Sequence, residues 1–358
     1  MSEETIVVRP DQLHEFMLRV FTKQGLPEPD ARTVADVLLA ADVRGIDSHG
    51  VSRIFYYVMK LQAGTITKTP DVKVVNETAG TALIDGDNGM GPVIGKRAMA
   101  LAIDKAEQCG IGFVGVRRSN HYGIAAYYTM MAVERGMLGM SGTNSICMVA
   151  PTYGAEQMFG TNPISLACPS AAGRPWVLDM STSSAPFGKL ELAMRSGTKV
   201  PSGWVQDGTG VPSDDPSVPM SGGALTPLGA TPEMSSHKGY GLAVMVDVLS
   251  GVLNGALWGP RQEGLTRLRM EPSDVGHFFL ALRVDGFRPL AEFGQAMDSM
   301  VEGLRGSKKA ANSERIFTHG EKEFEEEIRR REQGIPLHPF VKGVIESQAQ
   351  SNDVPLPW

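Results

Sequence analysis

Two histidines and an arginine stand in polar segments whose chemistry suits a small carboxylic acid. His49 and Arg53 lie four residues apart, a spacing that can place both on one side of a helix start. A guanidinium fork binds a carboxylate through two hydrogen bonds, and a neighbouring imidazole can donate to the adjacent oxygen. His121 follows a predicted buried strand, where α/β enzymes place catalytic groups, and an imidazole suits proton exchange at neutral pH. An ordinary surface, capping or core histidine is the alternative at each position.

Three further segments combine glycine with hydroxyl and amide groups, and each is expected at the end of a strand. They are 142–145 (GTNS), 160–163 (GTNP) and 178–183 (LDMSTS). Such loops offer hydrogen bonds to the amide, ribose and phosphate groups of a ligand, although one of them alone could be a common turn. Lys238, followed by a glycine, opens an apolar helix, where a cation and free N–H groups can meet an anion. An ordinary helix entry is the alternative there.

The segment 89–95 partly resembles a dinucleotide-binding glycine loop. It follows a predicted strand and opens a helix, but its third glycine stands one place too late for G-x-G-x-x-G, and Pro92 removes a backbone donor. The next strand ends in Arg117 and Arg118 instead of the acidic residue that binds a ribose. We therefore interpret this segment as a helix-entry turn, although an NADP-type variant would account for the two arginines.

The spacing of apolar residues predicts the elements that must position these groups. Helices are expected over 10–24, 30–44, 54–61, 92–108, 124–135 and 240–253, and strands over 72–75, 81–85, 111–116, 137–141, 164–168, 176–179 and 278–284. The strands 164–168 and 176–179 flank a short turn, as in an antiparallel hairpin, which a purely parallel sheet would not contain. The segment 198–236, dense in glycine and proline, is expected to form a long functional loop.

The composition is that of a folded protein. Of the 358 residues, 42% are hydrophobic, which is enough for a sizeable core. The net charge of -6 disfavours nucleic-acid binding, no apolar run is long enough to span a membrane, and the seven histidines lack metal-site spacing. We expect the three cysteines to be reduced, and we expect a cytoplasmic protein because the start lacks the features of a secretory signal.

Taken together, these segments resemble the type-2 malate/L-lactate dehydrogenase family, which includes ureidoglycolate and sulfolactate dehydrogenases and cyclic-imine carboxylate reductases. The matching strings are DSHGVSR (47–53), SNHYG (119–123), GTNPI (160–164), LDMSTSSAPFGK (178–189), HKGYGL (237–242) and GHFF (276–279). Their order and approximate spacing also match. No single string is decisive, but the set is highly specific and covers nearly the whole chain.

The resemblance implies an α/β (α+β-like) fold that is distinct from the Rossmann fold. An NAD(P)-binding and catalytic domain with a largely antiparallel or mixed sheet would span residues 74–299. Residues 1–73 together with 300–358 would form a helical domain from both termini. The resemblance also implies a homodimer that uses NAD or NADP and a small anionic 2-hydroxy or 2-oxo acid.

The resemblance further implies roles for individual residues. His121 would be the acid/base, and His49 and Arg53, with Ser48 and Thr161, would hold the substrate carboxylate. Asp179 would bind the nicotinamide ribose or orient a histidine, and the sequence does not choose between these roles. Contacts to the cofactor are implied for Ser145, Asp179, Met180, Ser181, Lys238, His319, Gly320 and Glu321. The chain departs from the family at Ser181, Ala230 and His319, where alanine, glycine and proline are common.

We therefore predict hydride transfer between a nicotinamide ring and the 2-carbon of a small 2-hydroxy or 2-oxo acid, with His121 exchanging the hydroxyl proton. One alternative is a reductase of a cyclic imine carboxylate, which would use the same clamp but protonate nitrogen. Another is a cofactor-sensing module without turnover. Malate, lactate, sulfolactate and ureidoglycolate all remain open as substrates, and so does the choice between NAD and NADP, with Arg117 and Arg118 as available cations.

Overall fold

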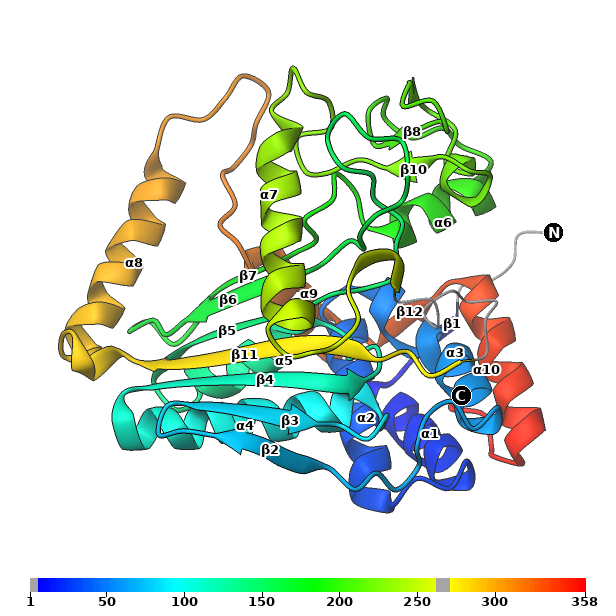
Figure 1. The fold of residues 1–358 in the computed structure, drawn as a ribbon, viewed down its shortest axis with the longest axis horizontal. Helices are drawn as coiled ribbons and strands as arrows, with labels where there is room; N and C mark the ends of the chain where they lie inside the picture. Colours follow the sequence, from blue (N-terminus) through cyan, green and yellow to red (C-terminus); the bar gives the residue numbers. More distant parts are fainter. Residues whose placement is uncertain (1–5, 262–270) are drawn as a thin grey trace.

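A computed structural model describes residues 6–261 and 271–358, and a seven-stranded sheet forms its centre (Figure 1). The strand order is β2-β3-β4-β11-β5-β6-β7, in which β3 and β4 pair in parallel and the other neighbours pair antiparallel. The strands are β2 (Lys73–Glu77), β3 (Thr81–Asp85), β4 (Ile111–Ser119), β5 (Met137–Thr143), β6 (Ile164–Cys168), β7 (Trp176–Met180) and β11 (Val275–Arg283). The predicted mixed sheet is confirmed, and so is the hairpin of β6 and β7.

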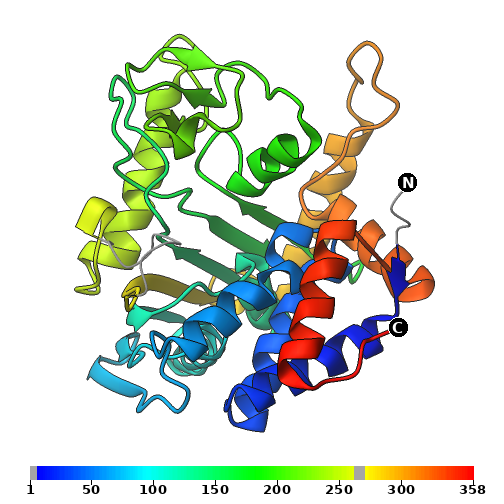
Figure 2. The ribbon, with the colours of Figure 1, turned by 90° about the vertical axis from the view of Figure 1, so that its right-hand side faces the viewer.

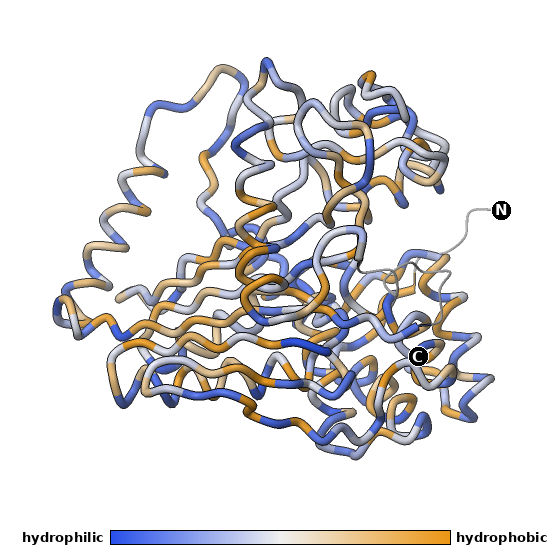
Figure 3. Tube along the Cα trace, in the orientation of Figure 1, coloured by the Kyte–Doolittle hydropathy of each residue, from blue (hydrophilic) through white to orange (hydrophobic). Residues whose placement is uncertain are grey.

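Helices cover both faces of this sheet. The helices α4 (Gly91–Cys109) and α5 (Ala125–Val133) pack on one face, where small side chains such as Ala98 and Ala102 are buried against Val114 and Val116. The helix α7 (Ser236–Asp247) and the turn Val248–Val252 contact β11, β4 and β5 from the other face. Hydrophobic positions recur along the central strands (Figure 3), because strands covered on both sides bury both sets of side chains.

The two ends of the chain come together beside the sheet (Figure 2). The helices α1 (Pro10–Lys23), α2 (Glu28–Val43) and α3 (Ile54–Gln62) share one core with α10 (Pro339–Asn352), and β1 (Ile6–Val8) pairs with β12 (Ile335–Leu337). Two further helices precede β12, namely α8 (Leu290–Gly306) and α9 (Glu321–Gln333). The proposed boundary at residue 300 falls inside α8, and the division into domains stays a prediction. No helix of the described ranges is long and apolar enough to cross a membrane.

The segment 198–236 contains more structure than the predicted loop. A small sheet joins β8 (Val205–Gln206), β9 (Pro212–Ser213) and β10 (Ala224–Leu225), and Val205 and Leu225 share a core with Leu190 of α6 (Phe187–Ser196). Strands of two residues leave no alternating pattern in a sequence, which explains why they were not predicted.

The glycine segment 89–95 is confirmed as a helix entry. The helix α4 begins at Gly91, and a Cβ at this position would overlap the carbonyl oxygens of Asn120 and His121. The side chain of Asn120 also donates to the carbonyl of Gly89 at 2.9 Å. The missing side chain at position 91 therefore lets α4 approach the segment that carries His121.

Arg117 and Arg118 are not the available cations that the sequence suggested. Their guanidinium groups lie 3.2 and 3.0 Å from the carboxylate of Asp85, and Arg118 also pairs with Asp87 at 2.9 Å. Both arginines lie at the β3–β4 side of the sheet, whereas β7 closes the opposite side. They are paired with protein carboxylates.

Candidate active site

The directions of the strands bring the predicted polar segments to one edge of the large sheet. Because the pairings make β4, β5 and β7 run in the same direction, the segments that follow them start from a common edge. These segments carry His121, Ser145 and Ser181. The segment 160–163 reaches the same edge from the other direction, because it leads into β6 and does not follow a strand as predicted.

Ser48, His49 and Arg53 lie in a short arm between α2 and α3. The arm consists of two single turns, 47–49 and 51–53, and not of one regular helix start. The hydroxyl of Ser48 lies 2.9 Å from Nδ1 of His49, and Nε of Arg53 donates to the carbonyl of Ser48 at 2.6 Å. Nη2 of Arg53 lies 3.9 Å from a carboxylate oxygen of Glu191 on α6. The Nε bond therefore orients the guanidinium plane, and Nη2 faces the carboxylate of Glu191.

Two groups from other elements hold this arm. The buried carboxylate of Asp42 on α2 accepts a hydrogen bond from the backbone N–H of Val51 at 2.7 Å, and a Cβ at position 50 would overlap that carboxylate. Arg330 of α9 donates to the backbone carbonyl of Asp42 at 2.7 Å and to the side chain of Asp47. Burial raises the pKa of Asp42 well above its ordinary value, which the bond from Val51 partly offsets. Sequence reasoning found neither Asp42 nor Arg330, because no local pattern marks them.

His121 lies against this arm. The rings of His49 and His121 stack with centroids 5.5 Å apart and an angle of 27° between their planes. On its other side, the hydroxyl of Tyr57 lies 2.7 Å from Nδ1 and 3.3 Å from the backbone oxygen of His121. The structure thus brings together the candidate acid/base and the candidate carboxylate clamp.

The surroundings of His49, Tyr57 and His121 determine where these side chains carry protons. Burial, and then the charge of Arg53, lower the pKa of His49 to about 3, so His49 is neutral at pH 7. Burial raises the pKa of Tyr57, so its hydroxyl keeps its proton. If this hydroxyl donates to the backbone oxygen of His121 and accepts from Nδ1–H, Nε2 is left to accept a proton from a ligand. No local pattern marks Tyr57 as a functional residue, although it lies one helical turn after Arg53.

A second polar group forms where the other three segments meet. The hydroxyl of Ser145 lies 3.3 Å from that of Thr161, and the carbonyl of Thr161 accepts from the N–H of Thr182 at 2.9 Å. Beneath them, the carboxylate of Asp247 accepts from the side-chain amides of Asn144 and Asn162 at 3.2 and 2.9 Å. Burial raises the pKa of Asp247, while both amide bonds lower it. This buried network holds the segments in one arrangement.

Asp179 is a residue of β7, and its side chain reaches the start of α5, the helix that follows the His121 segment. One of its carboxylate oxygens accepts from the N–H of Ala126 at 2.8 Å, a position where a helix N-terminus stabilises negative charge. Burial nevertheless raises the pKa of Asp179 to about 6. Met180 and Ser181 follow at the carboxyl end of β7. The roles of these three residues toward substrate or cofactor stay predictions.

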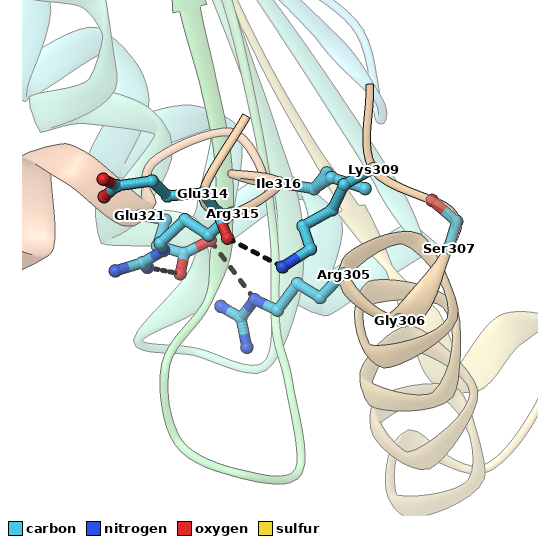
Figure 4. A pocket seen from close by; sticks show the side chains of 8 residues that line it. All are labelled: Arg305, Gly306, Ser307, Lys309, Glu314, Arg315, Ile316 and Glu321. Atoms are coloured by element: carbon cyan, nitrogen blue, oxygen red, sulfur yellow. Dashed lines mark hydrogen bonds and ion pairs between the residues drawn. The ribbon is translucent and has the colours of Figure 1, made fainter. Parts of the chain in front are cut away.

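His319, Gly320 and Glu321 lie beside the other end of β7. The carbonyl of His319 accepts from the N–H of Val177 at 3.4 Å, and its ring meets Trp176 edge-on at 5.4 Å. A cavity of about 310 Å³ opens here, lined in part by Trp176, His319 and Phe324. Both oxygens of Glu321 contact protein groups, since one lies 3.2 Å from Nε of Arg305 and the other pairs with Arg315 (Figure 4). Glu321 therefore holds this loop in place, whatever else it contacts.

Lys238 stands apart from the other predicted residues. It is exposed in the first turn of α7 and makes no ion pair with any residue of the described ranges. Cys109, Cys147 and Cys168 are free, as the sequence predicted. No cluster of metal-binding side chains is present in the ranges 6–261 and 271–358.

The chain is similar to known proteins over nearly its whole length. A model of the malate/L-lactate dehydrogenase family matches residues 8–344. The chain is 46% identical to a malate dehydrogenase from Pyrococcus abyssi, over 95% of this chain and 93% of that protein. It is 37% identical to an L-sulfolactate dehydrogenase from Methanocaldococcus jannaschii, over 91% and 92% of the two chains. A crystal structure of malate dehydrogenase from Entamoeba histolytica matches with a TM-score of 0.95 at 37% identity, over 99% and 100% of the two chains.

Proposed function

The chain belongs to the malate/L-lactate dehydrogenase family, and we propose that it interconverts a small 2-hydroxy acid and its 2-oxo acid by hydride transfer to or from NAD or NADP. The observation that carries this proposal is the contact between His121 and the arm of Ser48, His49 and Arg53. A proton-exchanging group beside a carboxylate-binding group is what the 2-position of such an acid requires.

In the proposed mechanism, the terminal nitrogens of Arg53 bind the substrate carboxylate, and neutral His49 donates to an adjacent oxygen. The bound nicotinamide supplies the hydride acceptor or donor. In oxidation Nε2 of His121 takes the hydroxyl proton as the hydride leaves the 2-carbon, and in reduction the same atom returns a proton to the carbonyl oxygen. Tyr57 keeps the opposite nitrogen occupied and so directs Nε2 toward the substrate.

We propose that the cofactor lies along the outer side of β7, the last strand of the large sheet in the described ranges. This outer side of β7 meets the segment of His319, whose carbonyl accepts from the N–H of Val177. The hydroxyl groups of Ser145 and Thr161 lie near one end of β7, and the cavity beside Trp176 and His319 lies at the other. We also propose a homodimer, as the family resemblance implies, and a cytoplasmic location, which the pattern of the three cysteines favours.

The decisive test is a panel of 2-oxo acids with NADH and with NADPH. Purified protein is mixed with pyruvate, oxaloacetate, sulfopyruvate or a cyclic imine carboxylate, and oxidation of the cofactor is followed at 340 nm. We expect turnover with at least one 2-oxo acid and a clear preference for one cofactor. Turnover with the cyclic imine alone would replace the proposed substrate class, and cofactor binding without any turnover would indicate a sensing module.

Replacing Tyr57 by phenylalanine should lower kcat by about 3- to 10-fold, because a neutral hydrogen bond contributes about 0.5–1.5 kcal/mol. The loss should come with a displaced pH–rate profile, since the hydroxyl influences the protonation of His121. Steady-state rates between pH 5 and pH 9 measure both effects. Tyr127→Phe, which removes a hydroxyl from the neighbouring helix α5, is the matched control. A Tyr57→Phe profile that superposes on the wild-type profile would contradict the role given to this hydroxyl.

A further inference from the structure

A buried histidine on the central strand β11 connects the two polar segments of the site. The side chain of His277 is fully buried between β4 and β5. Its Nε2 lies 2.9 Å from the hydroxyl of Ser119, and its Nδ1 lies 2.7 Å from that of Thr143. Ser119 precedes His121 by two residues, and Thr143 precedes Ser145 by two residues. One imidazole therefore contacts the start of both the His121 segment and the Ser145 segment.

The surrounding hydrogen bonds favour one tautomer of this ring. The hydroxyl of Thr143 donates to the carbonyl of Gly276 at 3.0 Å or to that of Asn144 at 2.9 Å, so it accepts from Nδ1–H of His277. The hydroxyl of Ser119 then donates to the unprotonated Nε2. The two nitrogens thus perform different tasks, one as a donor toward β5 and the other as an acceptor toward β4. Burial lowers the pKa of His277 to about 3, which agrees with a neutral ring.

Aromatic contacts fix the plane of this imidazole. The ring of Tyr122, the residue after His121, stacks on it with centroids 4.6 Å apart and an angle of 3°. Phe279 meets it nearly edge-on at 6.1 Å. Because β11 separates β4 from β5, these two strands share no backbone hydrogen bonds at this edge. The spacing of the segments that carry His121 and Ser145 depends on what lies between them, and His277 occupies that place.

We propose that His277 is a positioning residue with two separable functions: Nε2 holds the segment of the acid/base His121, and Nδ1 holds the segment of Ser145 that contacts the cofactor. This inference rests on the proposed function of those two residues. It assigns a role to a side chain that touches neither substrate nor cofactor.

Two substitutions separate the functions of the two nitrogens. In His277→Asn the side-chain amide can still donate to Thr143 but cannot reach Ser119, and in His277→Gln the amide oxygen can accept from Ser119 but the bond to Thr143 is lost. We expect His277→Asn to lower kcat by about 10-fold and to displace the pH–rate profile, with the Kd for NAD(P)H changed by less than about 2-fold. We expect His277→Gln to raise the Kd for NAD(P)H by about 10-fold while kcat at saturating cofactor stays within about 2-fold.

Cofactor fluorescence gives Kd independently of turnover, and His277→Phe, which lacks both bonds, should show both defects. Ser119→Ala and Thr143→Val remove the same bonds from the partner side, so they should reproduce the Asn and Gln patterns and replace those variants if either does not fold. The inference would be overturned if His277→Asn and His277→Gln changed kcat and the Kd for NAD(P)H to the same extent, or if Ser119→Ala and Thr143→Val did. It would also be overturned if the variants changed only the unfolding temperature. A wild-type protein that binds cofactor but turns over no 2-oxo acid would instead refute the proposed function.

Discussion

Replacing His121 by alanine should lower kcat by about 10²-fold or more, since general acid/base groups typically contribute about 10²- to 10⁴-fold. The proton of the substrate hydroxyl would then have no acceptor within the arm, because the pKa of His49 lies near 3 and its ring is a poor base. The bond that orients Arg53 does not involve His121, although His49 loses the ring on which it stacks, so KM should change less than kcat. Binding of NAD(P)H should persist.

Steady-state kinetics and cofactor fluorescence on the same preparation test this expectation. His121→Gln is a useful companion, since its amide retains polarity and much of the volume but cannot take up a proton near pH 7. Equal losses in the two variants would locate the effect in proton transfer and not in packing. Turnover close to that of the wild type in either variant would remove His121 from the mechanism.

Replacing Arg53 by lysine should raise the KM for the 2-oxo acid by about 10- to 100-fold, since a bidentate charge-assisted pair is worth a few kcal/mol and lysine lacks the planar fork. In the wild-type protein the bond from Nε to the carbonyl of Ser48 orients the guanidinium. A lysine ammonium keeps the charge, but all its donors are on one nitrogen, so it cannot be anchored by one nitrogen while two others bind the carboxylate side by side. A part of the loss should appear in kcat as well, because a loosely held carboxylate leaves the 2-carbon misplaced over the nicotinamide.

Arg32→Lys makes a matched control, because Arg32 is an exposed residue of α2 that pairs only with its helix neighbour Glu28 in the described part of the chain. That variant should behave like the wild type in all assays. The affinity for NAD(P)H should be the same in both lysine variants. If Arg53→Lys left KM and kcat unchanged, the substrate carboxylate would have to bind elsewhere.

The local sequence pattern predicted the features that depend on residues close together in the chain. The apolar spacing predicted helices such as α1 and α3 within two residues of their ends, and the hairpin of β6 and β7 followed from its short turn. The residue types of the segments around His49 and His121 indicated a carboxylate clamp and a proton-exchanging group, and these two roles stay predictions. Each of these features arises within about 20 residues, where helical and strand periodicity are directly visible.

What the sequence could not provide is the pairing of residues that lie far apart in it. The sequence suggested that Arg117 and Arg118 are available cations. In the structure the parallel pairing of β3 and β4 places Asp85 beside both arginines. Tyr57 and His121 are 64 positions apart, His277 and Ser119 are 158 apart, and Arg330 and Asp47 are 283 apart. Composition and periodicity determined the elements and the chemistry available at their ends. Only the packing of the sheet against the helices of both termini decided which of these groups meet, because long-range contacts depend on the whole fold and leave no signal in local spacing.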